Sequence, residues 1–128
     1  MGEGGAAFFT LADLRIGWSD TWYSTNNELL AVTPSSRYWQ LPYVIDLGAT
    51  APLVKLYPEP LTELGVYVPE PGGNLALIAR EVKDQRHYPV IRENRRERSF
   101  ILWGYNAGPS AMTERGQELF VNVAQSLR

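Results

Sequence analysis

Prolines and glycines interrupt this chain so often that few long helices fit between them. Nine prolines and eleven glycines are spread over 128 residues, and the stretches between them have the length of strands of four to eight residues. Residues 53–57 and 64–68 also alternate between two faces, as half-buried strands do. We therefore expect a β-rich middle, with strands at residues 28–33, 43–47, 52–57, 64–68, 75–82, 88–93 and 99–105.

The clearest hairpin is expected over residues 88–105. The polar segment Asn94-Arg-Arg-Glu97 lies between two strand-like runs, which predicts the tip of a hairpin. The run Phe100-Ile-Leu-Trp103 is apolar on both faces. We therefore expect it to form a central strand that is covered on both sides.

One helix is expected, at the C-terminal end. Thr113 is a suitable N-cap and Glu114 would occupy the first helical position, where the helix dipole favours an acid. An apolar stripe follows at helical spacing: Leu119, Phe120, Val123, Ala124 and Leu127. We expect this stripe to pack against Phe100 and Leu102, and a short helical turn to form near residues 10–14.

These elements predict an α+β fold, a mostly antiparallel β-sheet with one C-terminal helix packed on one face. The sequence contains no internal repeat and no linker-like segment, so a single domain is expected over residues 1–128.

Missing residue types exclude several kinds of chemistry. The chain has no cysteine, which excludes disulfides, thiolate nucleophiles and iron–sulfur clusters. His87 is the only histidine, which excludes sites that need two imidazoles. Any metal would have to be a hard, oxygen-ligated one, and we expect no metal site and no cofactor. His87 itself is expected to be a surface residue or a hydrogen-bonded structural residue.

The charge pattern argues against nucleic acids and membranes as partners. The formal net charge is −2, which does not favour binding to a polyanion. Arg95, Arg96 and Arg98 are interleaved with Glu93 and Glu97, so cross-strand ion pairs on a solvated hairpin are expected. No apolar run reaches the 18 or more residues of a spanning helix, and no signal peptide is indicated. We expect a cytoplasmic protein.

The candidate ligand site is an aromatic-rich segment in the first third of the chain. Flat rings with amide and carboxylate neighbours can stack a sugar or another planar ligand and fix its orientation. The residues that would form this site are Trp18, Asp20, Trp22, Tyr23, Asn27, Glu28, Tyr38 and Trp39. The same rings could instead fill the core of a small domain.

We therefore expect a non-catalytic binding module, with no catalytic residues, whose partner is a small molecule, a carbohydrate or another protein. Two alternatives stay open. A carboxylate-dependent glycan hydrolase would use two of the acids in this half of the chain, Asp13, Asp20, Glu28 and Asp46. A structural homo-oligomer, such as a homodimer, would bury the same aromatic rings at its interface.

Residues 89–122 contain three stretches that match a known arrangement. These are Pro89-Val-Ile-Arg, Ser99-Phe-Ile-Leu-Trp-Gly-Tyr105 and Pro109-Ser-Ala-Met-Thr-Glu-Arg-Gly-Gln-Glu-Leu-Phe-Val-Asn122. Together they resemble the C-terminal strand, turn and helix of class I glutamine amidotransferase-like domains of the trehalose-utilisation-like branch.

In that family the threonine starts the helix, the glycine lets the helix approach the sheet, and the Leu-Phe pair enters the core. Members that are amidotransferases use a nucleophilic Cys with a His, and this chain has no Cys. The resemblance therefore implies an inactive or rebuilt relative and transfers no catalytic residue.

Overall fold

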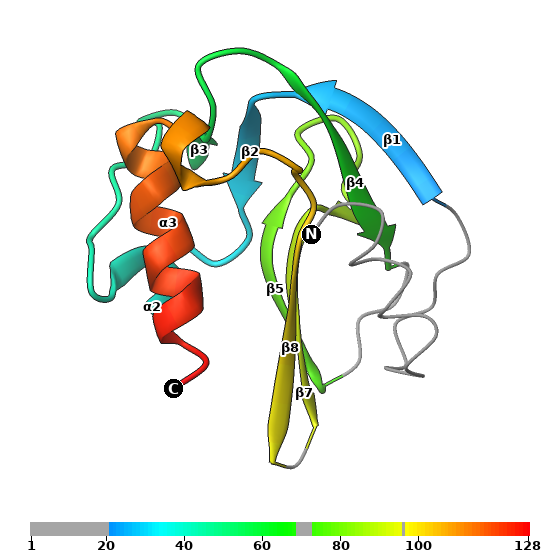
Figure 1. Cartoon of the computed structure of the whole chain (residues 1–128), viewed down its shortest axis with the longest axis vertical. Helices are drawn as coiled ribbons and strands as arrows, with labels where there is room; N and C mark the ends of the chain where they lie inside the picture. The colour runs from blue at the N-terminus through cyan, green and yellow to red at the C-terminus, as the bar shows by residue number, and fades with distance from the viewer. Residues whose placement is uncertain (1–20, 69–72, 96) are drawn as a thin grey trace.

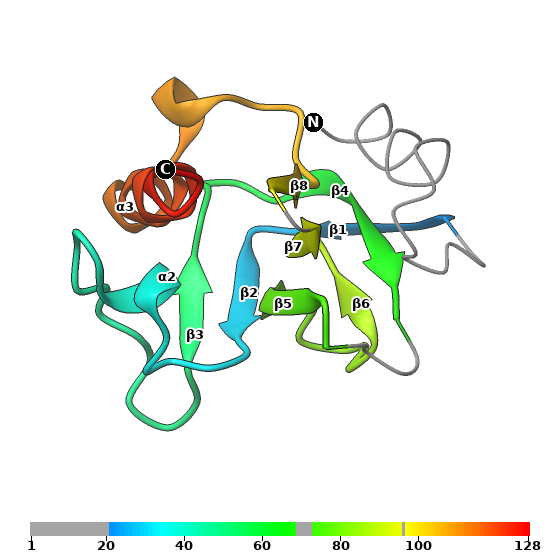
Figure 2. The same cartoon turned by 90° about the horizontal axis from the view of Figure 1, so that it is seen from below.

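The computed structural model describes residues 21–68, 73–95 and 97–128 and contains two antiparallel sheets and a C-terminal helix. The chain is α+β and mostly β, as the sequence predicts. The helix α3 and the short helix α2 lie on one side of the larger sheet, and β1 and β4 lie on the other side (Figures 1 and 2). None of the described helices is long and apolar enough to cross a bilayer.

The smaller sheet has three strands and the larger sheet has five. The smaller sheet has the order β1 (Thr21–Asn26), β4 (Leu61–Tyr67), β6 (His87–Tyr88). The larger sheet has the order β3 (Leu53–Lys55), β2 (Glu28–Ala31), β5 (Leu75–Arg80), β7 (Val90–Arg95), β8 (Arg98–Trp103). Every strand pairing is antiparallel.

The predicted hairpin over residues 88–105 is confirmed by β7 and β8, which pair from Val90↔Trp103 to Arg95↔Arg98. The expectation of a central strand at residues 100–103 is wrong, because β8 ends the order of the larger sheet. Its two-sided apolar pattern has another cause. Trp103 belongs to the core on the α3 side and Leu102 to the core that contains residues of β4, so both faces of an edge strand are covered.

The helix α3 (Glu114–Gln125) begins as predicted. The Thr113 side chain accepts a hydrogen bond from the Gly116 backbone N–H at 3.0 Å. A Cβ atom at Gly116 would lie 2.3 Å from the Leu56 carbonyl oxygen, so only glycine permits this close approach of the helix to the chain after β3. A 3-10 turn, η1 (Pro109–Ala111), precedes the helix.

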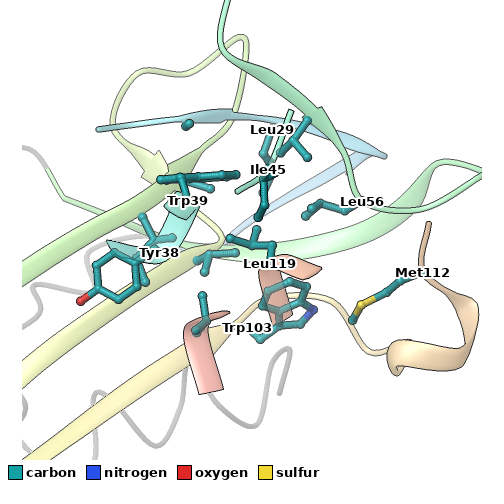
Figure 3. Packing of buried hydrophobic residues seen from close by; sticks show 14 of the residues in the cluster. Leu29, Tyr38, Trp39, Ile45, Leu56, Trp103, Met112 and Leu119 are labelled. Carbon is teal, nitrogen blue, oxygen red and sulfur yellow. The ribbon is translucent and has the colours of Figure 1, made fainter. Parts of the chain in front are cut away.

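The core has two parts, one on each side of the larger sheet. The first lies between α2 (Arg37–Gln40), α3 and the sheet, and includes Trp39, Leu119 and Trp103 (Figure 3). The second includes Leu64, Val66 and Leu102. The expected packing of Phe100 and Leu102 against the α3 stripe is wrong, because strand alternation places these two side chains in the second core.

The strand expected at residues 43–47 is also wrong, because this segment is part of an irregular connection between α2 and β3. The buried Asn122 side chain holds the connection. Its Nδ2 donates to the Tyr38 and Tyr43 carbonyl oxygens at 2.9 and 2.8 Å, and its Oδ1 accepts from the Tyr43 N–H at 3.0 Å. These bonds use backbone groups that a strand partner would need. The expected turn near residues 10–14 lies outside the described residues.

Candidate metal centre

Two carboxylates and the only imidazole of the chain meet inside the protein. Glu63 is in β4, Glu81 directly follows β5, and His87 is in β6. Their relative exposures are 1%, 6% and 0%. Charged side chains are rarely buried to this extent unless they are paired or bind a metal, so this cluster needs a physical explanation.

Strand alternation brings Glu63 and His87 to one face of the smaller sheet. Glu63, Gly65 and Tyr67 are two residues apart in β4 and therefore point the same way. His87 pairs with Tyr67, and directly paired residues share a face. A Cβ atom at Gly65 would lie 2.3 Å from His87 Nε2. The missing side chain at position 65 is thus what lets the imidazole lie across β4 toward Glu63.

A backbone hydrogen bond brings in Glu81, because its N–H donates to the His87 carbonyl oxygen at 2.9 Å. His87 Nε2 lies 3.1 Å from Glu63 Oε1 and 3.1 Å from Glu63 Oε2, and 3.9 Å from Glu81 Oε2. One ligand atom from each of the three side chains can be chosen so that all lie within 4.8 Å of one another. The three groups therefore form a compact set.

The strand β1 supplies neutral polar partners to both carboxylates. Ser24 Oγ donates to Glu81 Oε1 at 2.8 Å, and Asn26 Nδ2 donates to Glu63 Oε1 at 3.3 Å. The Tyr105 hydroxyl in turn donates to Asn26 Oδ1. These contacts hold Oε1 of each carboxylate, whereas Glu63 Oε2 meets His87 Nε2 at 3.1 Å and Glu81 Oε2 has no hydrogen-bond donor among the described residues.

Two buried polar atoms of the cluster lack a hydrogen-bond partner among the residues that the structure describes. These are Glu81 Oε2 and His87 Nδ1. An unsatisfied buried polar atom costs free energy, and more so when it carries charge. The Glu81 oxygen is also the one that faces His87 Nε2. The cluster therefore contains a buried acceptor that points at its centre with no donor to meet it.

With both carboxylates ionised, the cluster would hold more negative charge than one imidazole can offset. The described ion pairs of Glu63 and Glu81 both involve His87, and one imidazolium can neutralise only one carboxylate. Burial raises the pKa of the Glu63 carboxyl above its ordinary value, opposed by the hydrogen bond and the charge of His87. Burial, and next the charge of Glu63, raise the pKa of the Tyr105 hydroxyl, which keeps it a neutral donor. Either a proton on Glu63, which the raised pKa favours, or a divalent cation in place of that proton would remove the excess negative charge.

The donor atoms indicate which cation would fit. Carboxylate oxygens suit Mg²⁺, Ca²⁺ and Mn²⁺, whereas imidazole nitrogen suits Zn²⁺, Fe²⁺, Ni²⁺ and Cu²⁺. A mixed set of one nitrogen and two carboxylates favours Mn²⁺, Fe²⁺ or Zn²⁺ over Mg²⁺ and Ca²⁺, which prefer oxygen ligands alone. In a site with metal–ligand bonds of about 2.0–2.2 Å, neighbouring ligand atoms lie about 3–3.5 Å apart. The 3.1 Å separation between His87 Nε2 and Glu63 lies in this range, whereas the 3.9 Å separation to Glu81 Oε2 exceeds it, so the cluster would contract slightly around an ion.

The residues predicted for an aromatic ligand site are not brought together on a described surface. Tyr38 and Trp39 belong to the first core, with exposures of 9% and 0%. Asn27 and Glu28 are half-buried at the junction of β1 and β2, where Asn27 Nδ2 donates to the Tyr57 carbonyl oxygen at 3.2 Å. Trp18 and Asp20, and the side chains of Trp22 and Tyr23, lie outside the described residues. The aromatic ligand site stays a prediction.

Sequence reasoning missed Glu63 and Glu81 as site residues and gave His87 only a structural role. One signal was present in the sequence of β4. Its buried stretch is apolar except for Glu63, and Gly65, two positions later on the same face, has no side chain. The strand was expected to begin at residue 64, so Glu63 fell outside it. Comparisons of the chain with family models, with curated proteins and with solved structures found no match. The amidotransferase-like resemblance of residues 89–122 stays a prediction.

Proposed function

We propose that this protein is a non-catalytic binding protein for a divalent transition-metal ion, with Glu63, Glu81 and His87 as the ligands. The observation that carries the proposal is Glu81 Oε2. This buried carboxylate oxygen lacks a hydrogen-bond donor among the described residues and faces the imidazole and carboxylate of the other two ligands. A metal ion is the partner that would satisfy all three groups at once.

Charge supports a divalent ion in particular. Two ionised carboxylates and a neutral imidazole balance an ion of charge +2, whereas in the described part of the chain the ion pairs of both acids go to the one imidazole of His87. Removing a carboxylate from water costs several kcal/mol, about as much as a well-placed counter-charge returns. With both carboxylates ionised the buried cluster is therefore costly without a metal, and a bound divalent ion would offset that cost in place of a proton on Glu63.

The surroundings of the ligands resemble those of metal sites in general. Ligating carboxylates are usually held by outer hydrogen bonds, and here Ser24 and Asn26 each hold one oxygen of a carboxylate. The second imidazole nitrogen of a ligating histidine usually donates to a partner. His87 Nδ1 has none in the described part of the chain, which is a departure from the usual arrangement.

The test is metal titration of tag-free protein that has been stripped with a chelator. Isothermal calorimetry with Mn²⁺, Zn²⁺ and Co²⁺, and with Mg²⁺ and Ca²⁺ for comparison, should give one transition-metal ion per chain. Glu81→Gln should abolish this binding. Glu93→Gln is the matched control, because Glu93 is also a fully buried carboxylate but belongs to β7 and lies outside the cluster.

The proposal would be wrong if the wild type gave no binding heat and no thermal shift with any of these ions. It would also be wrong if Glu81→Gln and Glu93→Gln bound metal equally well, because the ion would then lie elsewhere. The cluster would in either case be a structural ion-pair network.

A further inference from the structure

We propose that Tyr105 and Asn26 are a positioning pair that fixes the Glu63 carboxylate for the metal and thereby sets the affinity of the site. This inference rests on the proposed metal-binding function. Neither residue would bind the metal itself. Asn26 contacts Glu63 directly, and Tyr105 contacts Asn26, so both act through the Glu63 carboxylate.

The backbone places all three residues on one face of the smaller sheet. Glu63 pairs with Ser24 of β1 on one side and forms a β-bridge with Tyr105 on the other. Asn26 follows Ser24 by two residues and so shares its face. Strand pairing alone therefore brings the Tyr105 ring, the Asn26 amide and the Glu63 carboxylate together, from segments far apart in the sequence.

Two hydrogen bonds, one at each end, hold the Asn26 amide. An asparagine amide can present either its donor or its acceptor to a neighbour, and its terminal torsion is only loosely restrained. Glu63, as a carboxylate, needs the NH₂ group. Glu63 therefore sets which end of the amide faces it, and the Tyr105 hydroxyl, which can donate or accept, donates to the remaining Oδ1 and holds the amide in place. Without that hydroxyl the amide loses its second anchoring contact.

Fixing one oxygen of Glu63 prepares the other for the metal. Both Glu63 oxygens lie 3.1 Å from His87 Nε2, and Asn26 contacts only Oε1, so Oε2 is the oxygen without a second protein donor. Partners of this kind typically change metal affinity by about 10–100-fold when they are removed. We expect Tyr105→Phe, which removes only the hydroxyl, to weaken binding by about tenfold.

The chain offers a matched control in Tyr57. Its ring lies against the Tyr105 ring, with centroids 4.9 Å apart, and both side chains are almost completely buried. The Tyr57 hydroxyl belongs to a different network, because it donates to the Ala107 carbonyl oxygen at 2.7 Å and accepts from Trp103 Nε1 at 3.2 Å. Tyr57→Phe therefore removes a buried tyrosine hydroxyl from the same ring pair without touching Asn26.

The experiment compares wild type, Tyr105→Phe, Tyr57→Phe and Asn26→Ala as tag-free, chelator-stripped proteins, each checked for folding by circular dichroism. Zn²⁺ affinity is measured by competition with a chromophoric chelator, and Co²⁺ absorption in the visible range reports the ligand geometry. We expect Tyr105→Phe and Asn26→Ala to lose about tenfold in affinity and to show altered Co²⁺ bands. Tyr57→Phe should match the wild type in Zn²⁺ affinity and in its Co²⁺ bands, even if the substitution lowers the stability of the fold.

Each outcome decides between the two proposals. No metal binding by the wild type would overturn the metal function, and this inference with it. Wild-type binding with an unchanged affinity and Co²⁺ spectrum in Tyr105→Phe would overturn the positioning pair alone. Equal losses in Tyr57→Phe and Tyr105→Phe would do the same, because they would indicate a general packing effect. If Tyr105→Phe fails to fold, Asn26→Ala tests the pair by the same two readouts, since Asn26 is only half-buried in an edge strand.

Discussion

Replacing Glu81 by glutamine should have opposite effects on the metal-free and the metal-bound protein. The substitution keeps the shape of the side chain and the acceptor for Ser24 Oγ, and it removes one buried negative charge. In the metal-free wild type, Glu81 Oε2 is a buried carboxylate oxygen without a donor among the described residues, and the variant removes it. With metal, the folded state loses a charged ligand.

The magnitude for the metal-free protein follows from the distances. At an effective dielectric constant of about 20, two unit charges 3.9 Å apart, the separation of Glu81 Oε2 and His87 Nε2, attract by about 4 kcal/mol, a gain that exists only when the imidazole carries a second proton. When both carboxylates are ionised, the repulsion between their oxygens, which lie within 4.8 Å, is at least about 3.5 kcal/mol. These terms nearly cancel, so the desolvation cost of the carboxylate decides. We expect Glu81→Gln to stabilise the metal-free fold by about 1–2 kcal/mol.

The magnitude with metal follows from mass action. A ligand at 100 times its dissociation constant stabilises the native state by about 2.7 kcal/mol, which is about 10 °C in melting temperature for a domain of this size. The wild type should gain this shift, and Glu81→Gln should gain almost none. The variant should therefore melt above the wild type in chelator and below it in metal.

Scanning calorimetry of both proteins, in chelator and in excess Zn²⁺ or Mn²⁺, measures all four melting temperatures. The Glu93→Gln control should keep the wild-type metal shift. A metal-induced shift in Glu81→Gln as large as that of the wild type would show that Glu81 is not a ligand. A clear destabilisation of the metal-free variant would show instead that Glu81 is a well-compensated partner of His87.

Three further predictions test the packing around the site and the core. Gly65→Ala should displace the His87 ring, because the new methyl group would lie 2.3 Å from Nε2, and calorimetric titration should show metal binding lost. Leu119→Ala should lower the free energy of unfolding in urea by about 2–5 kcal/mol, because the side chain is fully buried between α3 and the larger sheet. In an alkaline titration followed by ultraviolet absorption, at least three of the seven tyrosines should ionise at a higher pH than a free tyrosine, and Tyr105 only when the protein unfolds. Burial raises the pKa of these three hydroxyls above the ordinary value of about 10. At a pH between the unfolded-state and the folded-state pKa, the folded protein keeps protons that the unfolded chain has released. The contribution of these protons to stability is lost as the pH rises through the folded-state pKa. The three tyrosines are Tyr57, Tyr88 and Tyr105.

Local patterns in the sequence predicted the local parts of the fold. The start of α3 was predicted because a threonine cap and a following acid act within one helical turn. The β7–β8 hairpin was predicted because its two strands are joined by a short polar tip. In both cases the residues that decide the structure are neighbours in the chain.

Long-range arrangement was not predictable in the same way. The apolar run at residues 100–103 shows that both faces of β8 are covered, but a central strand and an edge strand between two cores give the same pattern. The connection at residues 43–47 has the composition of a strand, yet Asn122, about 80 residues later, takes its backbone hydrogen-bonding groups. Nothing in the local sequence carries that information.

The candidate metal centre is the extreme case of this limit, because its residues come from segments that meet only in the folded chain. Glu63 and His87 are on strands of the smaller sheet, whereas Glu81 follows β5 of the larger one. The cluster thus lies where the two sheets are joined, through the hydrogen bond from the Glu81 N–H to the His87 carbonyl oxygen. A buried set of unbalanced charges at such a junction would weaken it in the absence of a counter-ion. A divalent ion held there would connect the two sheets by three ligands, so the proposed binding and the stability of the junction should rise and fall together.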